Sequence, residues 1–201
     1  MSDTISTSMA TADAHPIGLI VTDDLQRNRL TVFFRLLLAI PHFIVVLLWG
    51  VLTELIVLVA WFAALFTGQV PEGLHNFIAS WLRYATRVTA YVFLLTDPFP
   101  QFGSGGSYPV DARIDPTAPQ SRLTVGFRIF LAIPAMLLTY VFRMVNQIVA
   151  LLGWFYTLAT GHMHEGMRNI SAWLLQYETQ TWGYVLLLTG RYPSLAGAPT
   201  A

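Results

Sequence analysis

The sequence contains no cysteine and no lysine, and only 11% of its residues are charged. The missing cysteines exclude disulfides, thiolate nucleophiles and cysteine-ligated metals. With 11 basic and 11 acidic residues the net charge is zero, and no block of basic residues offers a nucleic-acid surface. Residues 1–14 lack the basic start and apolar core of a signal peptide, and we expect them to be a disordered cytoplasmic tail.

Long apolar runs dominate what is present. The stretch from Leu36 to Phe66 carries one carboxylate and one histidine, and almost all its other side chains are apolar. A domain of 201 residues has no core large enough to bury such a run, whereas its length suffices to cross a bilayer. The sequence therefore predicts an integral membrane protein.

The apolar run occurs twice, at an offset of 93 residues. Residues 29–41 read RLTVFFRLLLAIP and residues 122–134 read RLTVGFRIFLAIP, and YVFLLT at 91–96 returns as YVLLLT at 184–189. About 29 of roughly 72 aligned positions are identical, which indicates a tandem duplication. We divide the chain into repeats at 15–100 and 108–193, a Gly/Ser linker at 101–107, and tails at 1–14 and 194–201.

The motifs RLLLAIPH, AWFAALFTG, PEGLH and YVFLLTDPFP, with a YPV-like prefix, resemble a bacterial membrane family known as domain of unknown function 4389. The first copy fits this pattern better than the second, in which His42 is replaced by Ala135 and Pro71 by His164. The resemblance implies a membrane location. Some relatives carry a lipase label, but this chain has no G-x-S-x-G elbow to activate a serine, and we expect it not to be an enzyme.

Each repeat is predicted to hold an interfacial helix and a helical hairpin, in an all-α fold with short strand-like prefixes. Residues 29–40 form the interfacial helix, which Pro41 separates from a first span at 42–66. Residues 72–96 form a second helix, which either crosses the bilayer or lies on its surface. The prefixes 15–22 and 108–115 are two short strands that pair with each other.

Arginine positions favour four spans arranged as two parallel hairpins about an axis along the membrane normal. In that arrangement, most arginines and both termini lie on the cytoplasmic side of a bacterial inner membrane. The alternative, with the second helices on the surface, would point the two repeats in opposite directions and place several arginines outside.

A polar cluster is predicted near the middle of the spans. A carboxylate at that depth is costly unless it is paired, and parallel hairpins would bring Glu54 to the depth of Arg143. We expect an ion pair between them, with Asn146 and Gln147 as hydrogen-bond partners. The pair would either fix helix packing or relay a proton or ion.

Six arginines are predicted to contact lipid headgroups or a partner: Arg29, Arg35, Arg83, Arg87, Arg122 and Arg128. The His162, His164 and Glu165 group in a turn is a weak metal candidate because alternating loop residues are poorly organised for ligation, and we expect neither a metal nor a cofactor. The expected partners are membrane lipids and, as further options, a larger membrane complex or a second copy. The leading function is an accessory or lipid-binding membrane module, and the alternative is a small transporter or channel using Glu54 and Arg143.

Overall fold

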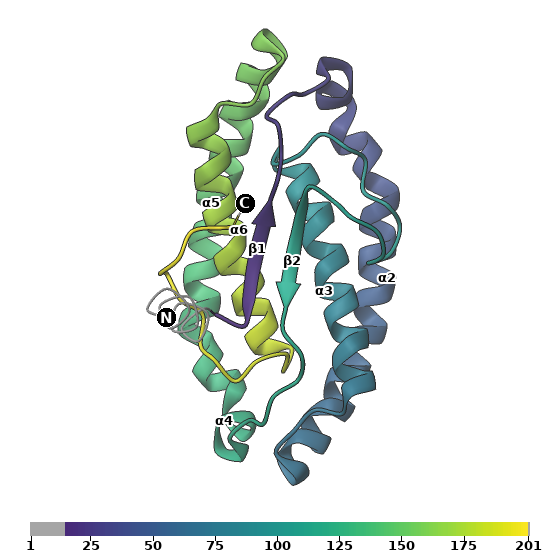
Figure 1. The fold of residues 1–201 in the computed structure, drawn as a ribbon, viewed down its shortest axis with the longest axis vertical. Helices are drawn as coiled ribbons and strands as arrows, with labels where there is room; N and C mark the ends of the chain where they lie inside the picture. Colours follow the sequence, from purple (N-terminus) through teal and green to yellow (C-terminus); the bar gives the residue numbers. More distant parts are fainter. Residues whose placement is uncertain (1–14, 201) are drawn as a thin grey trace, which may run out of the picture.

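A computed structural model describes residues 15–200 of the chain. The element order is β1 (Ile17–Val21), α2 (Arg29–Thr67), α3 (Glu72–Val92), β2 (Val110–Ile114), α4 (Arg122–Gly126), α5 (Arg128–Thr160) and α6 (Glu165–Val185). The tail at 1–14 predicted to be disordered lies outside the described residues. The fold is mostly helical, and the two repeats appear as two long helical hairpins, α2–α3 and α5–α6, side by side (Figure 1).

The predicted pairing of the two prefixes is confirmed. β1 and β2 form an antiparallel two-stranded sheet, and Leu19 pairs with Ala112, its equivalent 93 residues later. Ile17, Leu19, Val110 and Ala112 are buried on the face that packs on the helices, as the alternating pattern predicts. The sheet lies over α3 and α6, while α2 and α5 pack on the outer flanks of these helices (Figure 1).

The predicted parallel arrangement of the hairpins is wrong. Trp61, near the end of α2, donates its indole N–H to the carbonyl of Val125 in α4, directly before α5, 3.0 Å away. Trp154, near the end of α5, donates to the carbonyl of Val32 at the start of α2, again at 3.0 Å. The two long helices therefore run in opposite directions. A pseudo-two-fold axis passes between Leu19 and Ala112, and between Thr86 and Thr179, whose hydroxyls lie 3.4 Å apart.

The repeats exchange their prefixes across this axis. β1 of the first repeat packs on α6 of the second, and β2 packs on α3. The backbone N–H of Arg27 donates to the carbonyl of Gly161, and that of Gln120 donates to the carbonyl of Gly68. Sequence reasoning placed both prefixes beside each other, but the repeat offset alone does not say which hairpin each one covers.

The predicted break at Pro41 is also wrong, because α2 runs unbroken from Arg29 to Thr67. Pro41 lies on the exposed side of the helix, whereas Arg35, Ala39 and His42 lie on the buried stripe that faces the rest of the protein. The proline removes one helical hydrogen bond on the outer face, and packing on both sides of it keeps the helix continuous. Each long helix ends at a glycine in the left-handed region, Gly68 or Gly161, both with φ of 80°.

Among residues 15–200, the helices long and apolar enough to cross a membrane are α2 and α5, and the count of four membrane-embedded helices stays a prediction. Only 11% and 22% of their most apolar stretches are buried, so these are not the enclosed core helices of a soluble domain. α6, by contrast, is buried along most of its second half, including Gln176, Glu178 and Gln180. The predicted second helix at 72–96 is confirmed except at its end, where α3 stops at Val92.

Candidate functional site

Two equivalent arginines, Arg35 and Arg128, are buried inside the hairpins. The guanidinium of Arg35 donates to the carbonyls of Tyr91 and Thr96, at 2.6 and 2.8 Å, and lies over the ring of Tyr91. Arg128 repeats the arrangement with the carbonyls of Tyr184 and Thr189. Both arginines are 2% exposed. They satisfy the carbonyls at the end of α3 and α6, so the predicted contact of these two side chains with lipid headgroups is wrong.

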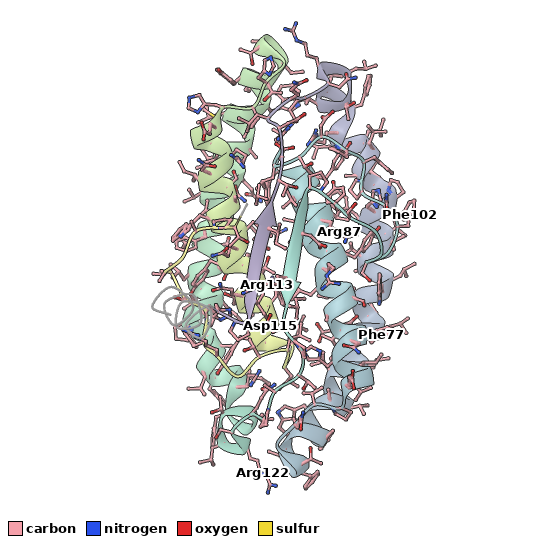
Figure 2. All side chains as sticks on the ribbon, in the orientation of Figure 1. Phe77, Arg87, Phe102, Arg113, Asp115 and Arg122 are labelled. Carbon is pink, nitrogen blue, oxygen red and sulfur yellow. The ribbon has the colours of Figure 1, made fainter. Side chains whose placement is uncertain are left out.

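The other four predicted headgroup arginines divide into two groups. Arg87 is 1% exposed; it makes two hydrogen bonds to the carboxylate of Asp111 and two more to linker carbonyls (Figure 2). Arg83 is partly exposed and donates to the carbonyl of Ala112. Arg29 and Arg122 stay exposed as the first residues of α2 and α4, and Figure 2 shows Arg122 at one end of the long axis. Of the six, only Arg29 and Arg122 are exposed residues.

The predicted ion pair between Glu54 and Arg143 does not form. Because α2 and α5 are antiparallel, Glu54 lies level with residues near 132 on α5, roughly 16 Å along the helix axis from Arg143. Arg143 instead pairs with Glu178 on α6, with 2.5 Å between Nη1 and Oε1. Glu54 is exposed, and none of the ion pairs among residues 15–200 includes it.

The pair of Arg143 and Glu178 is asymmetric in its surroundings. The Glu178 side chain is 9% exposed, and burial raises the pKa of its carboxyl, an effect that the nearby Arg143 charge opposes. The Arg143 side chain is 48% exposed, although it lies in the middle of an apolar helix. Sequence reasoning missed Glu178. The signal was present in the comparison of the repeats, since Gly50 and Ala85 at the equivalent positions both change to charged residues in the second copy.

Asn146 and Gln147, the two predicted hydrogen-bond partners of the ion pair, lie on different sides of α5. Asn146 faces α6, is 1% exposed, and neither atom of its amide has a hydrogen-bond partner among the described residues. The hydroxyl of its equivalent, Thr53, donates a hydrogen bond to the carbonyl of Trp49. Gln147, the equivalent of Glu54, lies on another side of α5 and borders a cleft with Arg143. The structure thus keeps Arg143 and Gln147 together and removes Glu54 and Asn146 from the predicted cluster.

The cleft lies between the first half of α2 and the second half of α5 and has a volume of about 540 Å³. This volume falls in the range of small-ligand sites. Most of its surface is apolar, and the end of α3 closes one side. Its lining residues are Arg35, Leu36, Phe43, Thr89, Val92, Phe93, Leu94, Arg143, Gln147, Ala150, Leu151 and Trp154.

In the turn before α6, which holds the metal candidate, His164 caps the helix. The Nδ1 atom of His164 accepts a hydrogen bond from the backbone N–H of Gly166, which caps the start of α6. Within the described part of the chain, no three His, Asp or Glu side chains gather as a metal site requires. His42 of α2 is fully buried, and its Nδ1 lies 2.7 Å from the hydroxyl of Tyr84.

These features define a helical protein made of two inverted copies of a long hairpin, with exchanged strands and a largely exposed apolar pair of helices. The family of domain of unknown function 4389 matches residues 29–103 and 122–196, so the chain belongs to this family as a tandem duplication. The exchanged strands β1 and β2 lie outside both matched segments. Neither the curated proteins nor the solved structures contain a match.

Proposed function

We propose that this chain is a non-enzymatic membrane module that binds lipid through α2 and α5. The observation that carries the proposal is the exposed surface of these helices. On α2 most large apolar residues outside the buried stripe are 38% exposed or more, and α5 shows the same pattern. An apolar surface of this extent is far larger than a soluble monomer tolerates, and a lipid environment would cover it.

The distribution of polar structure supports an in-plane orientation for these helices. The sheet, the linker and the chain after α6 are irregular or have open edges, and the sheet carries the exposed pair Arg113 and Asp115 (Figure 2). Such backbone cannot face hydrocarbon, because its amide groups would lack partners. If the long axis crossed the bilayer, the sheet would lie at mid-depth. We therefore place α2 and α5 along the membrane, with the sheet in water on the cytoplasmic side.

In this orientation the exposed Arg29 and Arg122 lie at opposite ends of the apolar surface. Each is the first residue of a helix, α2 or α4, and each side chain reaches over the glycine that ends the other repeat's long helix. Both could extend to phosphates at the membrane surface. The transporter alternative rested on Glu54 and Arg143 sharing a site, and their separation removes its main argument.

Single cysteines in this naturally cysteine-free chain test the orientation. Gln69 and His162 are equivalent exposed residues in the turns at opposite ends of the molecule, and Ser107 lies in the linker. We expect Gln69→Cys, His162→Cys and Ser107→Cys to resist a membrane-impermeant maleimide in intact cells and to react after lysis.

The alternatives give different labelling patterns. Labelling of only one of the two turns in intact cells would mean that the long axis crosses the bilayer. Labelling of both turns, with Ser107→Cys protected, would restore the parallel four-span arrangement. Recovery of the protein in the soluble fraction without detergent would contradict the membrane proposal itself.

A further inference from the structure

The two repeats differ at one position that decides whether the space between α2 and α5 is open. Thr89 of α3 borders the cleft, and its equivalent on α6 is Trp182. The indole of Trp182 packs against the apolar cluster that includes Ala60 and Ala64 of α2. A large side chain thus fills one of two equivalent places, and a small one leaves the other open.

The open place also has a cation, Arg143, that its equivalent lacks. Arg143 and Gln147 border the cleft, where the other repeat has Gly50 and Glu54. One nitrogen of Arg143 is bonded to Glu178, and nearly half of the side chain remains exposed. A guanidinium has five donors in a fork that matches phosphate, so the pair with Glu178 leaves donors for a second anion.

We infer that the cleft holds one phospholipid, whose phosphate accepts hydrogen bonds from Arg143 and whose acyl chain runs along Leu151 toward Trp154. This inference rests on the proposed membrane function, since the cleft opens between the two helices proposed to lie in lipid. An exposed guanidinium on an apolar membrane surface is costly unless it meets a phosphate, and the cleft supplies apolar cover for a chain beside it. A phospholipid brings an anion and an apolar chain together in one molecule.

Matched variants can distinguish a lipid bound in the cleft from lipids that coat the exposed helices in general. Leu151 borders the open cleft and is 57% exposed, and its equivalent Leu58 on α2 is 56% exposed. Leu151→Trp should therefore obstruct the cleft, while Leu58→Trp places the same bulk on an equally exposed site of the other repeat. Thr89→Trp provides a second obstruction and copies the residue found at the closed place.

Native mass spectrometry of delipidated protein in micelles doped with phosphatidylglycerol tests the inference. The wild type and Leu58→Trp should retain one phosphatidylglycerol, and Leu151→Trp and Thr89→Trp should bind it about tenfold more weakly. Diacylglycerol with the same chains should bind the wild type about tenfold more weakly than phosphatidylglycerol does, because it has no phosphate.

Arg143 requires a double change, because Arg143→Gln alone leaves the buried Glu178 without its partner. The variant with Arg143→Gln and Glu178→Gln should fold and should lose the preference for phosphatidylglycerol over diacylglycerol. Equal retention by the wild type and both obstructed variants would overturn the inference, as would an unchanged preference in the double variant. Vesicle flotation of the same proteins reports on the proposed membrane function separately: it should be unaffected by Leu151→Trp, and failure of the wild type to float would contradict that function.

Discussion

Close packing between β1 and α6 depends on one glycine. A Cβ added at Gly183 would lie 2.0 Å from Cδ1 of Ile17. The equivalent contact in the other repeat joins Ala90 to Val110, so a larger helix residue there faces a smaller strand residue. We expect Gly183→Ala to lower the free energy of unfolding by about 1 kcal/mol, as the overlap outweighs the gain in helix propensity.

The partner change Ile17→Val gives a matched control. It should cost about 1 kcal/mol alone and should restore most of the stability when combined with Gly183→Ala, because the pair then copies Ala90 and Val110. Chemical denaturation in detergent measures the free energy of unfolding of the wild type, the two single variants and the double variant. Strictly additive losses would show that Ile17 and Gly183 do not pack as described.

At pH values below neutral, His15 should destabilise the fold. Burial lowers the pKa of its imidazole, and its Nδ1 lies 3.0 Å from the backbone N–H of Ile17. Because the unfolded chain takes up this proton at a higher pH, the stabilisation is fully present above about pH 6.5 and is lost as the pH falls. Between about pH 7.5 and pH 5.5 the melting temperature of the wild type should fall by more than that of His15→Gln. An equal fall in both proteins would assign the effect to other groups.

Among the helices, the continuity of α2 past Pro41 makes a testable prediction. Replacing this proline by alanine restores a backbone donor in a helix that is already continuous, so Pro41→Ala should raise the free energy of unfolding by about 1 to 3 kcal/mol. Spin labels at the exposed Leu30 and Leu52 should lie about 33 Å apart along the axis, both with and without the proline. A distance that lengthens markedly in Pro41→Ala would indicate a bend at this residue, as the sequence alone suggests.

Local patterns predicted most of the elements and failed where burial decides. The strand predicted at 108–115 contains β2, and the helix predicted at 72–96 contains α3. Pro41 was misread because a sequence does not show on which side of a helix a proline lies. Arg35 and Arg128 were misread because an arginine in an apolar run reads equally well as an anchor at the membrane surface or as a buried partner of helix-end carbonyls.

For the molecule as a whole, the direction of the second repeat could not be obtained from the repeat offset. A duplication states that two units are alike, and parallel or inverted placement depends on contacts between residues far apart in the chain, such as Trp61 with Val125. The predicted ion pair between Glu54 and Arg143 is wrong for the same reason, because it was derived from parallel hairpins. The asymmetries between copies, Gly50 with Arg143 and Thr89 with Trp182, are visible in the sequence and identify the cleft once the direction is known.

The exchange of strands predicts that neither repeat folds alone as a monomer. A fragment of residues 1–107 retains α2 and α3 but loses β2, which covers α3, and leaves β1 without α6 beneath it. Fragments 1–107 and 108–201 should each unfold without a cooperative transition when monomeric. Expressed together, they should copurify in equal amounts and melt as one unit, since every exchanged contact can form between separate chains.

An insertion in the linker is the control for this experiment. Ten additional Gly and Ser residues after Ser104 keep the chain intact and add only a small loop-closure cost, so the melting temperature should change little. If a single fragment were monomeric and melted cooperatively, each hairpin would be a domain with its own core, and the exchanged strands would be accessory to the fold. If the fragments assemble only together, or one fragment forms a symmetric dimer, the inverted pair of repeats is the folding unit.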